Sequence, residues 1–322
     1  MLLPAYNAED YVVASVESLL AQTFADFEIV VIDDGSTDST PVLLSELTAR
    51  DQRLRVITHR VNQGLVVSLN DGLAAARGEL IARLDADDTS RPHRLERQVR
   101  VFEETPDAVL CATAYERVDS AGHVIRTACP PITHAALAGA LLTGNCLCHS
   151  SVMFRRSDAL LLGGYHADWF PAEDYDLWVR LLARGRYRGI DTVEVRYLEN
   201  PGGVSSSSTT RQTEIANQRA AEYVAQGSAQ LPGANAAAAL AVAPAGSWRH
   251  ERTAVRRLQQ AALGIAADLR RRGIDTGGLW AAPLGTSMHL MRGHHRLLRQ
   301  LLLFVYAPRL AMAGRIDRIR GR

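Results

Sequence analysis

Apolar and polar residues follow two different periods along the first 85 residues of the chain. Residues 12–20 place valine and leucine at the three- and four-residue spacing of an amphipathic helix. Residues 27–34, FEIVVIDD, form instead a continuous apolar run that is typical of a buried strand. Strands that alternate with helices predict an α/β fold, with a mostly parallel sheet flanked by helices. Further helices are predicted at 40–50 and 64–78, and further strands at 53–59 and 79–85.

The pattern loosens beyond residue 90 and predicts elements of several kinds. Residues 108–127 read as a hairpin that turns at Ala121 and Gly122. The composition changes beyond about Ser208, where Ala, Gly and Pro become frequent between arginine-rich helices. We therefore expect a catalytic domain over 1–205 and a helical C-terminal extension over 206–322. The other predicted elements are helices at 91–105 and 173–185 and strands at 151–156 and 192–200, the last entering a loop.

Polar residues stand where each predicted strand of the first half ends. In open α/β sheets ligands bind outside the carboxyl ends of the strands, so these residues are expected to meet in one crevice. They are Asn7, Asp33, Asp34, Asn62 and Asp85.

Three carboxylates, Asp85, Asp87 and Asp88, follow the strand at 79–85 with only Ala86 between them. Carboxylates held this close are costly unless a cation neutralises them, and oxygen ligands select a hard ion such as magnesium or manganese. Such an ion takes part of its shell from substrate phosphates, which predicts a phosphorylated ligand. The alternative is a solvated turn in which an aspartate caps a helix near Ser90.

The letters DADDT also match the D-x-D-x-T pattern of haloacid-dehalogenase-like phosphatases. Those enzymes usually carry this motif on their first strand, whereas it lies here on the fourth. They also add a lysine or arginine and a later acidic pair, and this chain contains no lysine. Placement therefore argues against a phosphatase.

The amino-acid composition excludes several classes of protein. The 322 residues are 47% hydrophobic and 22% charged, as in a globular protein, and the net charge of +1 gives no overall attraction to nucleic acid. Without lysine, the chain cannot use a P-loop, Schiff-base or pyridoxal-phosphate lysine. The four cysteines lack zinc-site spacing, and the N-terminal residues show no signal peptide or anchor, so a cytoplasmic location is expected.

Several motifs in a fixed order resemble the family 2 glycosyltransferases of the GT-A, Rossmann-like fold. The resemblance covers about residues 1–205 and implies transfer of a sugar from a nucleoside-diphosphate donor to an acceptor, with inversion at the anomeric carbon. Its motifs are LLPAYNAEDYVVASVESLLAQTFADFEIVVIDDGSTDST, NQG with LNDGLAAARGELIARLDADD, RPHRLERQ, HSSVMFRRS with GGY, and AEDYDLWVRL.

The resemblance assigns donor-site roles to residues at the strand ends. It implies that Asp33 hydrogen-bonds the base or ribose, that Asp85 touches the ribose, and that Asp87 ligates the metal at the diphosphate. Asp88 is expected either to support the site from behind or to cap the following helix, and Asp34 to hold its loop. The residues implied to border the nucleotide pocket are Pro4, Tyr6 and Asn7.

The motif AEDYDLWVRL supplies a candidate base. An inverting transfer needs one base for the acceptor hydroxyl, and the resemblance gives that role to Asp174, with Glu173 beside it. Both are predicted in the first turn of a helix, where the macrodipole favours an anion. The alternative is that they are ordinary helix-start carboxylates. Trp178 is expected in the core and His149 to be structural.

The chain departs from the family pattern at residues 197–201, YLENP. Many relatives place an arginine after this tyrosine and a histidine before this proline, which puts in question how the diphosphate is gripped from that loop. The residues ahead of LLPAYN are also few, which predicts a shortened first strand.

The implied partners are a nucleotide-sugar donor, first of all a UDP-sugar, and a saccharide or lipid-linked acceptor of bacterial surface polysaccharide synthesis. A catalytically weak sugar-nucleotide-binding protein is the alternative. Residues 287–322 combine arginines with an apolar run too short to span a bilayer. They predict either a helix packed on the catalytic domain or a peripheral contact with the inner face of the plasma membrane.

Overall fold

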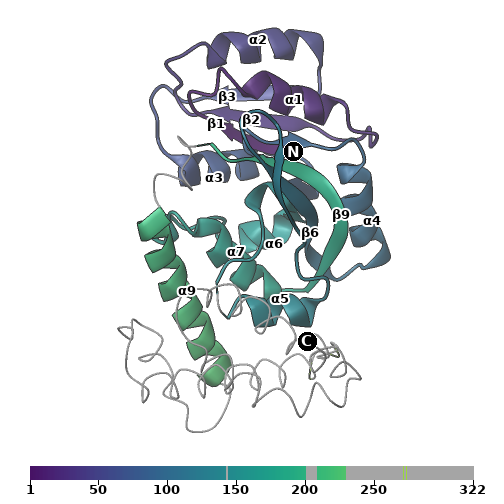
Figure 1. Cartoon of the computed structure of the whole chain (residues 1–322), viewed down its shortest axis with the longest axis vertical. Coiled ribbons are helices and arrows are strands. Elements are labelled where there is room, and N and C mark those ends of the chain that lie inside the picture. Colours follow the sequence, from purple (N-terminus) through teal and green to yellow (C-terminus); the bar gives the residue numbers. More distant parts are fainter. Residues whose placement is uncertain (143, 201–208, 230–270, 272, 274–322) are drawn as a thin grey trace. The chain divides into compact units, whose positions relative to one another are not determined.

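The computed structural model describes residues 1–142, 144–200, 209–229, 271 and 273 (Figure 1). Internal contacts group residues Met1–His134 and Cys146–Ala216 into one compact unit. Residues Ala135–Asn145 and the chain from Asn217 onward belong to a second unit. The predicted domain boundary at 205 and the predicted membrane contact at 287–322 lie outside the described residues.

The first unit begins with a parallel sheet in the order β1–β2–β3 (Figure 1). β1 spans Leu2–Ala5, β2 spans Ile29–Asp33 and β3 spans Leu54–Thr58. β2 lies in the middle because it pairs with β1 on one side and β3 on the other. The predicted parallel α/β arrangement is thereby confirmed.

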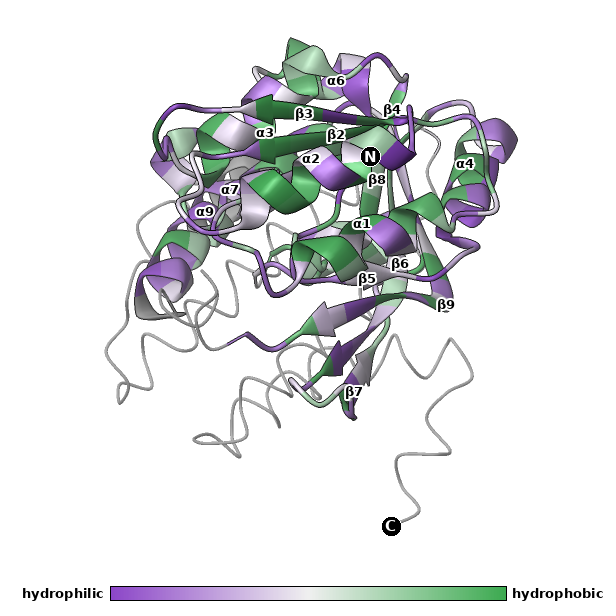
Figure 2. Ribbon diagram, turned by 90° about the horizontal axis from the view of Figure 1, so that it is seen from above, coloured by the Kyte–Doolittle hydropathy of each residue, from purple (hydrophilic) through white to green (hydrophobic). Residues whose placement is uncertain are grey.

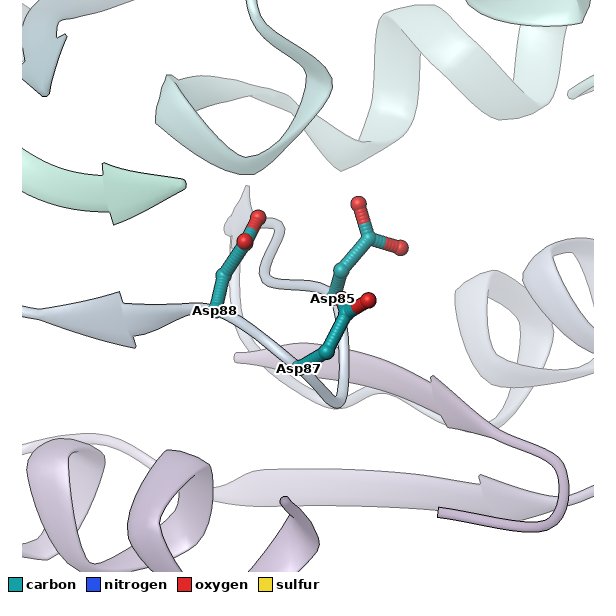
Figure 3. A group of neighbouring side chains, drawn as sticks. All are labelled: Asp85, Asp87 and Asp88. Carbon is teal, nitrogen blue, oxygen red and sulfur yellow. The ribbon is translucent and has the colours of Figure 1, made fainter. Parts of the chain in front are cut away.

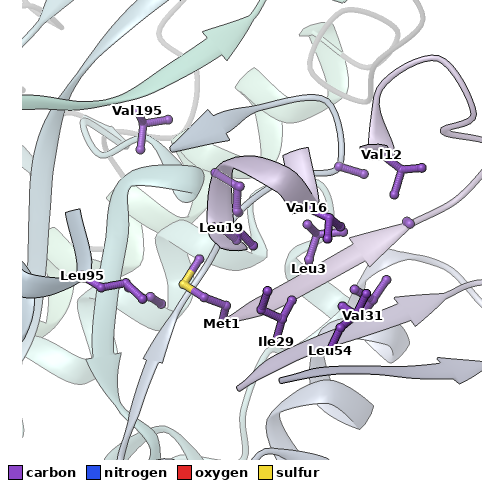
Figure 4. Packing of buried hydrophobic residues seen from close by; sticks show 14 of the residues in the cluster. Met1, Leu3, Val12, Val16, Leu19, Ile29, Val31, Leu54, Leu95 and Val195 are labelled. Carbon is purple, nitrogen blue, oxygen red and sulfur yellow. The ribbon is translucent and has the colours of Figure 1, made fainter. Parts of the chain in front are cut away.

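Helices cover both faces of this sheet. α1 (Val12–Leu20) and α2 (Thr40–Arg50) lie on one face and α3 (Leu65–Ala75) on the other (Figure 1). Alternate strand residues face opposite layers, so Leu3 and Val31 join the α1 side, which Figure 4 shows. Leu2 and Ile32 face α3, whose Gly72 lies so close to Leu2 that a β-carbon would clash. The strands are therefore apolar on both faces, as Figure 2 shows for β2.

A second sheet follows in the order β4–β8–β6–β9–β5, with β7 paired to β6. Only β6 and β9 run parallel among its pairs, and the others are antiparallel. The predicted hairpin is confirmed by the pairing of β6 with β7 around Gly122. The bounds are Leu80–Ala82 for β4, Thr89–Ser90 for β5, Ala108–Val118 for β6, Val124–Ala128 for β7, Val152–Arg155 for β8 and Arg186–Leu198 for β9.

β9 begins six residues before the strand predicted at 192. The prediction began too late because glycines interrupt the apolar pattern in this stretch. Gly189 lies inside β9, and a β-carbon on it would come 2.2 Å from the carbonyl oxygen of Pro131. The strand therefore needs glycine where it passes this backbone.

The remaining helices bear the other functional candidates. α4 spans Arg94–Glu104, α6 spans Arg156–Leu161 and α7 spans Glu173–Leu182. Short 3-10 turns occupy His149–Ser151 and Ala167–Trp169, and α5 and α9 span His134–Ala140 and Thr209–Ala229. None of the helices in the described part of the chain combines the length and apolarity needed to cross a membrane.

Candidate active site

The three carboxylates of the acidic turn, Asp85, Asp87 and Asp88, lie directly after β4. The backbone N–H of Leu84 donates to the carbonyl of Leu2 (3.1 Å), so the chain leaving β4 runs beside β1 and joins the two sheets. One oxygen from each carboxylate lies within 4.8 Å of the others. The side chains point to the same side of the turn (Figure 3). This places an all-oxygen ligand set at the carboxyl end of the strands.

The carboxylate of Asp85 is held in place by two neighbours. It forms an ion pair with Arg83, whose side chain is only 1% exposed, and accepts a hydrogen bond from the Ser150 hydroxyl (3.0 Å). The same hydroxyl accepts from the Asp85 backbone N–H (3.0 Å) and from Arg83 (3.2 Å). Hydrogen bonds to charged groups are stronger than neutral ones, so this arrangement fixes the carboxylate.

The other two carboxylates are held from the end of β9. Asn200 donates its side-chain N–H to Asp87 Oδ2 (3.2 Å), and the backbone N–H of Leu198 donates to Asp88 Oδ1 (2.9 Å). Burial, followed by the charge of Asp85, raises the pKa of Asp87 and raises that of Asp88 well above its usual range. Asp88 Oδ2 is buried and has no hydrogen-bond partner among the described residues.

The expectation that an aspartate caps a helix near Ser90 is wrong. Ser90 lies in β5, and α4 begins only at Arg94. Asp88 bonds to β9 instead and therefore supports the turn from behind.

Arg94 of α4 is a buried residue to which sequence reasoning gave no role. Its guanidinium donates to the carbonyls of Arg83 (2.8 Å) and Val152 (3.1 Å) and to Gln98 (3.0 Å). Burial lowers its pKa to about 10. Arg94 thus ties the segments that carry the acidic turn and Ser150, although α4 reads as an arginine-rich solvated helix.

The candidate nucleotide-border residues lie at the end of β1. Pro4 is buried in β1, whereas Tyr6 is 49% exposed. Asn7 adopts a positive φ of 47° and accepts the backbone N–H of Thr37 (2.8 Å). Asp33 is fully buried and accepts the backbone N–H of Ser36 (3.1 Å).

Asp34 holds its loop, as expected. Its carboxylate accepts the backbone N–H groups of Gln63 (2.9 Å) and Gly64 (2.8 Å). His59 lies between Asp34 (2.6 Å) and Asp71 (3.0 Å). Burial lowers the pKa of His59, but the hydrogen bonds and charges of the two aspartates outweigh it and raise the pKa. Sequence reasoning missed His59, whose signal is its place directly after β3.

Glu173 and Asp174 open α7 in different environments. Glu173 is 4% exposed, and its Oε2 has no hydrogen-bond partner within the part of the chain that the structure describes. Burial, followed by the charge of Asp174, raises the pKa of Glu173 to about 8. Asp174 is half-buried and accepts the backbone N–H of Tyr175 (2.6 Å). Burial therefore outweighs the helix macrodipole at Glu173, contrary to the expectation of two anions.

Tyr165 is a buried residue on which the charges of both acidic groups act. After burial and the opposing charge of Arg83, the charges of Asp174, Glu173 and Asp85 all raise its pKa. Asn70 of α3 fixes its backbone by a pair of 2.8 Å hydrogen bonds. The acidic turn and the start of α7 are thus both close enough to Tyr165 for their charges to act on it.

His149 and Trp178 are structural, as expected. Trp178 is fully buried, with its ring 5.7 Å from that of His149 and 5.9 Å from that of Phe154. His149 Nε2 lies 3.0 Å from the Tyr165 hydroxyl, and burial, followed by the charge of Arg83, lowers the pKa of His149 well below its usual value.

Comparisons with known proteins agree with this geometry. The model of Glycosyl transferase family 2 matches residues 1–161. The putative glycosyltransferase EpsE of Bacillus subtilis is 32% identical over 200 residues, which cover 61% of this chain and 70% of EpsE. The O-antigen biosynthesis glycosyltransferase WbnJ of Escherichia coli is 32% identical over 184 residues, 56% of this chain and 70% of WbnJ.

Two solved structures share the fold. S. aureus TarS 1-349, in complex with UDP-GlcNAc, aligns with a TM-score of 0.58 at 17% identity over 92% of each chain. The mannosyltransferase PcManGT from Pyrobaculum calidifontis, in complex with GDP-Man and Mn²⁺, aligns with a TM-score of 0.54 at 20% identity over 98% of this chain and 86% of its own. The chain therefore belongs to glycosyl transferase family 2 and is a glycosyltransferase with the GT-A fold.

Proposed function

We propose that this glycosyltransferase moves a sugar from a nucleoside-diphosphate donor to a saccharide or lipid-linked acceptor, with metal assistance and inversion. The observation that carries the proposal is the cluster of three carboxylates in the acidic turn. Asp85 of this cluster is held by Ser150, which follows the His149 that contacts Tyr165, and the charges at the start of α7 act on the same tyrosine. The O-antigen function in the name of WbnJ favours an acceptor of bacterial surface polysaccharide synthesis. Family membership removes the phosphatase alternative.

The donor side is assigned to the strand ends. Asp85 is fixed by Arg83 and Ser150, and its side chain is still 31% exposed, which supports its assignment to a ribose hydroxyl. The TarS complex with UDP-GlcNAc and the PcManGT complex with GDP-Man support a nucleotide-sugar donor. Of these two classes we propose a UDP-sugar. Beside Asp85, the donor-binding residues are Pro4, Tyr6, Asn7 and Asp33.

The residues of the acidic turn fit a hard divalent cation. Their donor set is entirely carboxylate oxygen, which suits magnesium or manganese. Asp87 is the proposed ligand, because its carboxylate is held by a neutral amide and not by a cation. When bound, the ion supplies Lewis-acid stabilisation of the diphosphate leaving group. The Mn²⁺ in the PcManGT complex supports this assignment.

The start of α7 is assigned to proton transfer. Asp174 takes the proton of the acceptor hydroxyl, whose oxygen attacks from the face opposite the diphosphate. Glu173 beside it carries a proton near neutral pH, since its pKa lies at about 8. Asp174 is then the carboxylate assigned to receive the proton.

Nucleotide release tests the proposal. The protein is incubated with UDP-sugars and GDP-sugars, Mn²⁺ or Mg²⁺, and saccharide or lipid-linked acceptors, and free UDP or GDP is measured with and without EDTA. We expect acceptor-dependent release that EDTA abolishes, and a product whose anomeric configuration, by NMR, is opposite to that of the donor. Donor binding without release would favour the catalytically weak binding protein, and a retained configuration would contradict the single-base mechanism.

A further inference from the structure

The end of β9 contacts the acidic turn at two successive points. β9 pairs with β5 at Thr89↔Arg196 and Ser90↔Val195, directly after the turn. Two and four residues beyond Arg196, Leu198 and Asn200 donate the hydrogen bonds to Asp88 and Asp87. One strand end therefore holds two of the three carboxylates.

Asn200 is a neutral donor, and its neutrality has a chemical consequence. An amide N–H orients a carboxylate and leaves its negative charge uncompensated, whereas an arginine in the same place would compete with a divalent ion for that charge. Asp85 already has a cationic partner in Arg83. Groups that orient a metal ligand from behind typically change metal affinity or activity by about 10–100-fold when they are removed.

The same residue falls where the sequence departs from the family pattern. Many relatives place a histidine before the proline at 201, and Asn200 in its place puts in question how the diphosphate is gripped from this loop. Asn200 instead donates to the candidate metal ligand Asp87 (3.2 Å). At this departure from the family pattern, the side chain of Asn200 therefore makes its own contact with the acidic turn.

We propose that Asn200 is a positioning residue for Asp87, through which the end of β9 sets the affinity of the site for the divalent cation. The inference rests on the proposed function, in which Asp87 ligates the metal. It predicts that loss of the Asn200 amide weakens metal binding and leaves the proton transfer by Asp174 intact.

The test measures Mn²⁺ binding without turnover. The full chain is titrated with Mn²⁺ in the presence of UDP, and separately of GDP, and free Mn²⁺ is followed by its EPR signal. Asn200→Leu keeps the size of the side chain and removes the donor, and we expect about tenfold or greater loss of Mn²⁺ affinity. Asn200→Ser keeps a short donor and is expected to lose less.

A matched control lies one residue away. Among the described residues Glu199 forms an ion pair with Arg117 and not with the acidic turn, so Glu199→Gln is expected to bind Mn²⁺ like the wild type. Steady-state rates add a second readout: with Asn200→Leu, raising the Mn²⁺ concentration should restore the rate, because the base is untouched. A loss that saturating metal does not restore would contradict positioning through the metal.

The outcomes separate the inference from the proposed function. Wild-type Mn²⁺ affinity in folded Asn200→Leu overturns the role of Asn200, while loss of binding in Asp87→Ala would leave the metal assignment standing. Absence of Mn²⁺ binding by the wild type with either nucleotide overturns both. If Asn200→Leu fails to fold by circular dichroism, Asn200→Ser decides by the same titration.

Discussion

The acidic turn and the start of α7 use the same residue types in opposite ways. In the turn, each carboxylate receives a donor: Ser150 for Asp85, and Asn200 and the backbone of Leu198, both at the end of β9, for Asp87 and Asp88. At α7, one Glu173 oxygen is buried with no hydrogen-bond partner among the described residues. Burial beside a second carboxylate raises the pKa at both places. The difference is that each carboxylate of the turn also has a donor that orients it, which suits a cation and its phosphate ligand.

Substitution of Asp87 in the acidic turn is expected to have the largest effect. Asp87→Ala should abolish transfer and remove metal-dependent donor binding, because the proposed metal ligand is lost. Thermal melting should show that the fold survives, and EPR titration with Mn²⁺ and nucleotide measures the binding. Full turnover by this variant in Mg²⁺ or Mn²⁺ would overturn the metal assignment.

Asp174→Asn should lower kcat by about 100- to 10,000-fold, the usual size of a general-base effect. Donor affinity should stay close to that of the wild type, since Asp174 is assigned to the acceptor. Steady-state kinetics and donor titration separate the two quantities. If donor affinity fell and the rate did not, Asp174 would be a binding carboxylate.

Ser150→Ala tests whether the hydrogen bond to Asp85 contributes to binding of the nucleotide-sugar donor. The hydroxyl holds the charged Asp85, and a hydrogen bond to a charged group contributes about 1.5–3 kcal/mol, so we expect the donor KM to rise about tenfold or more with a smaller change in kcat. The neighbouring Ser151 donates to the carbonyl of Cys148 instead, and Ser151→Ala is the control. Equal effects of the two substitutions would point to packing and not to Asp85.

Glu173→Gln tests the proton at α7 through stability. The folded pKa of about 8 lies above the ordinary value of 4.5, so the neutral acid stabilises the fold fully below pH 4.5 and this contribution is lost as pH rises through 8. The glutamine stays neutral, so the Tm of the variant should gain several degrees on that of the wild type between pH 5 and pH 9, since about 1 kcal/mol shifts Tm by about 2–4 °C. Glu103→Gln, at an exposed site, is the control, and a pH-independent difference for Glu173→Gln would contradict the retained proton.

Sequence reasoning reached the parallel sheet and the acidic turn because both are encoded locally. Continuous apolar runs identified β2 and β3, and the letters DADD stand next to one another in the chain. Apart from the hairpin of β6 and β7, the antiparallel pairs of the second sheet were not predicted, since a strand's own residues do not name its partner.

The supporting residues of the site were missed for a different reason. Arg94 lies on an arginine-rich helix and looks like a solvated side chain, yet it is buried because the carbonyls of Arg83 and Val152 face it. Glu173 was expected to be an anion at a helix start, and only its burial shows that it keeps a proton. Such roles depend on contacts between residues far apart in the sequence.

The length of β9, 13 residues, determines where Leu198 and Asn200 reach the acidic turn. The strand starts shortly after α7 ends and finishes beside the acidic turn (Figure 1). The segment from Asp174 to Asn200 therefore runs without interruption from the candidate base to the residue that contacts the candidate metal ligand Asp87. Deleting one residue of β9 would draw its end back by about 3.3 Å and turn alternate side chains to the other face. Leu198 and Asn200 would then lose both carboxylates together, so this stretch should tolerate changes of residue type far better than changes of length.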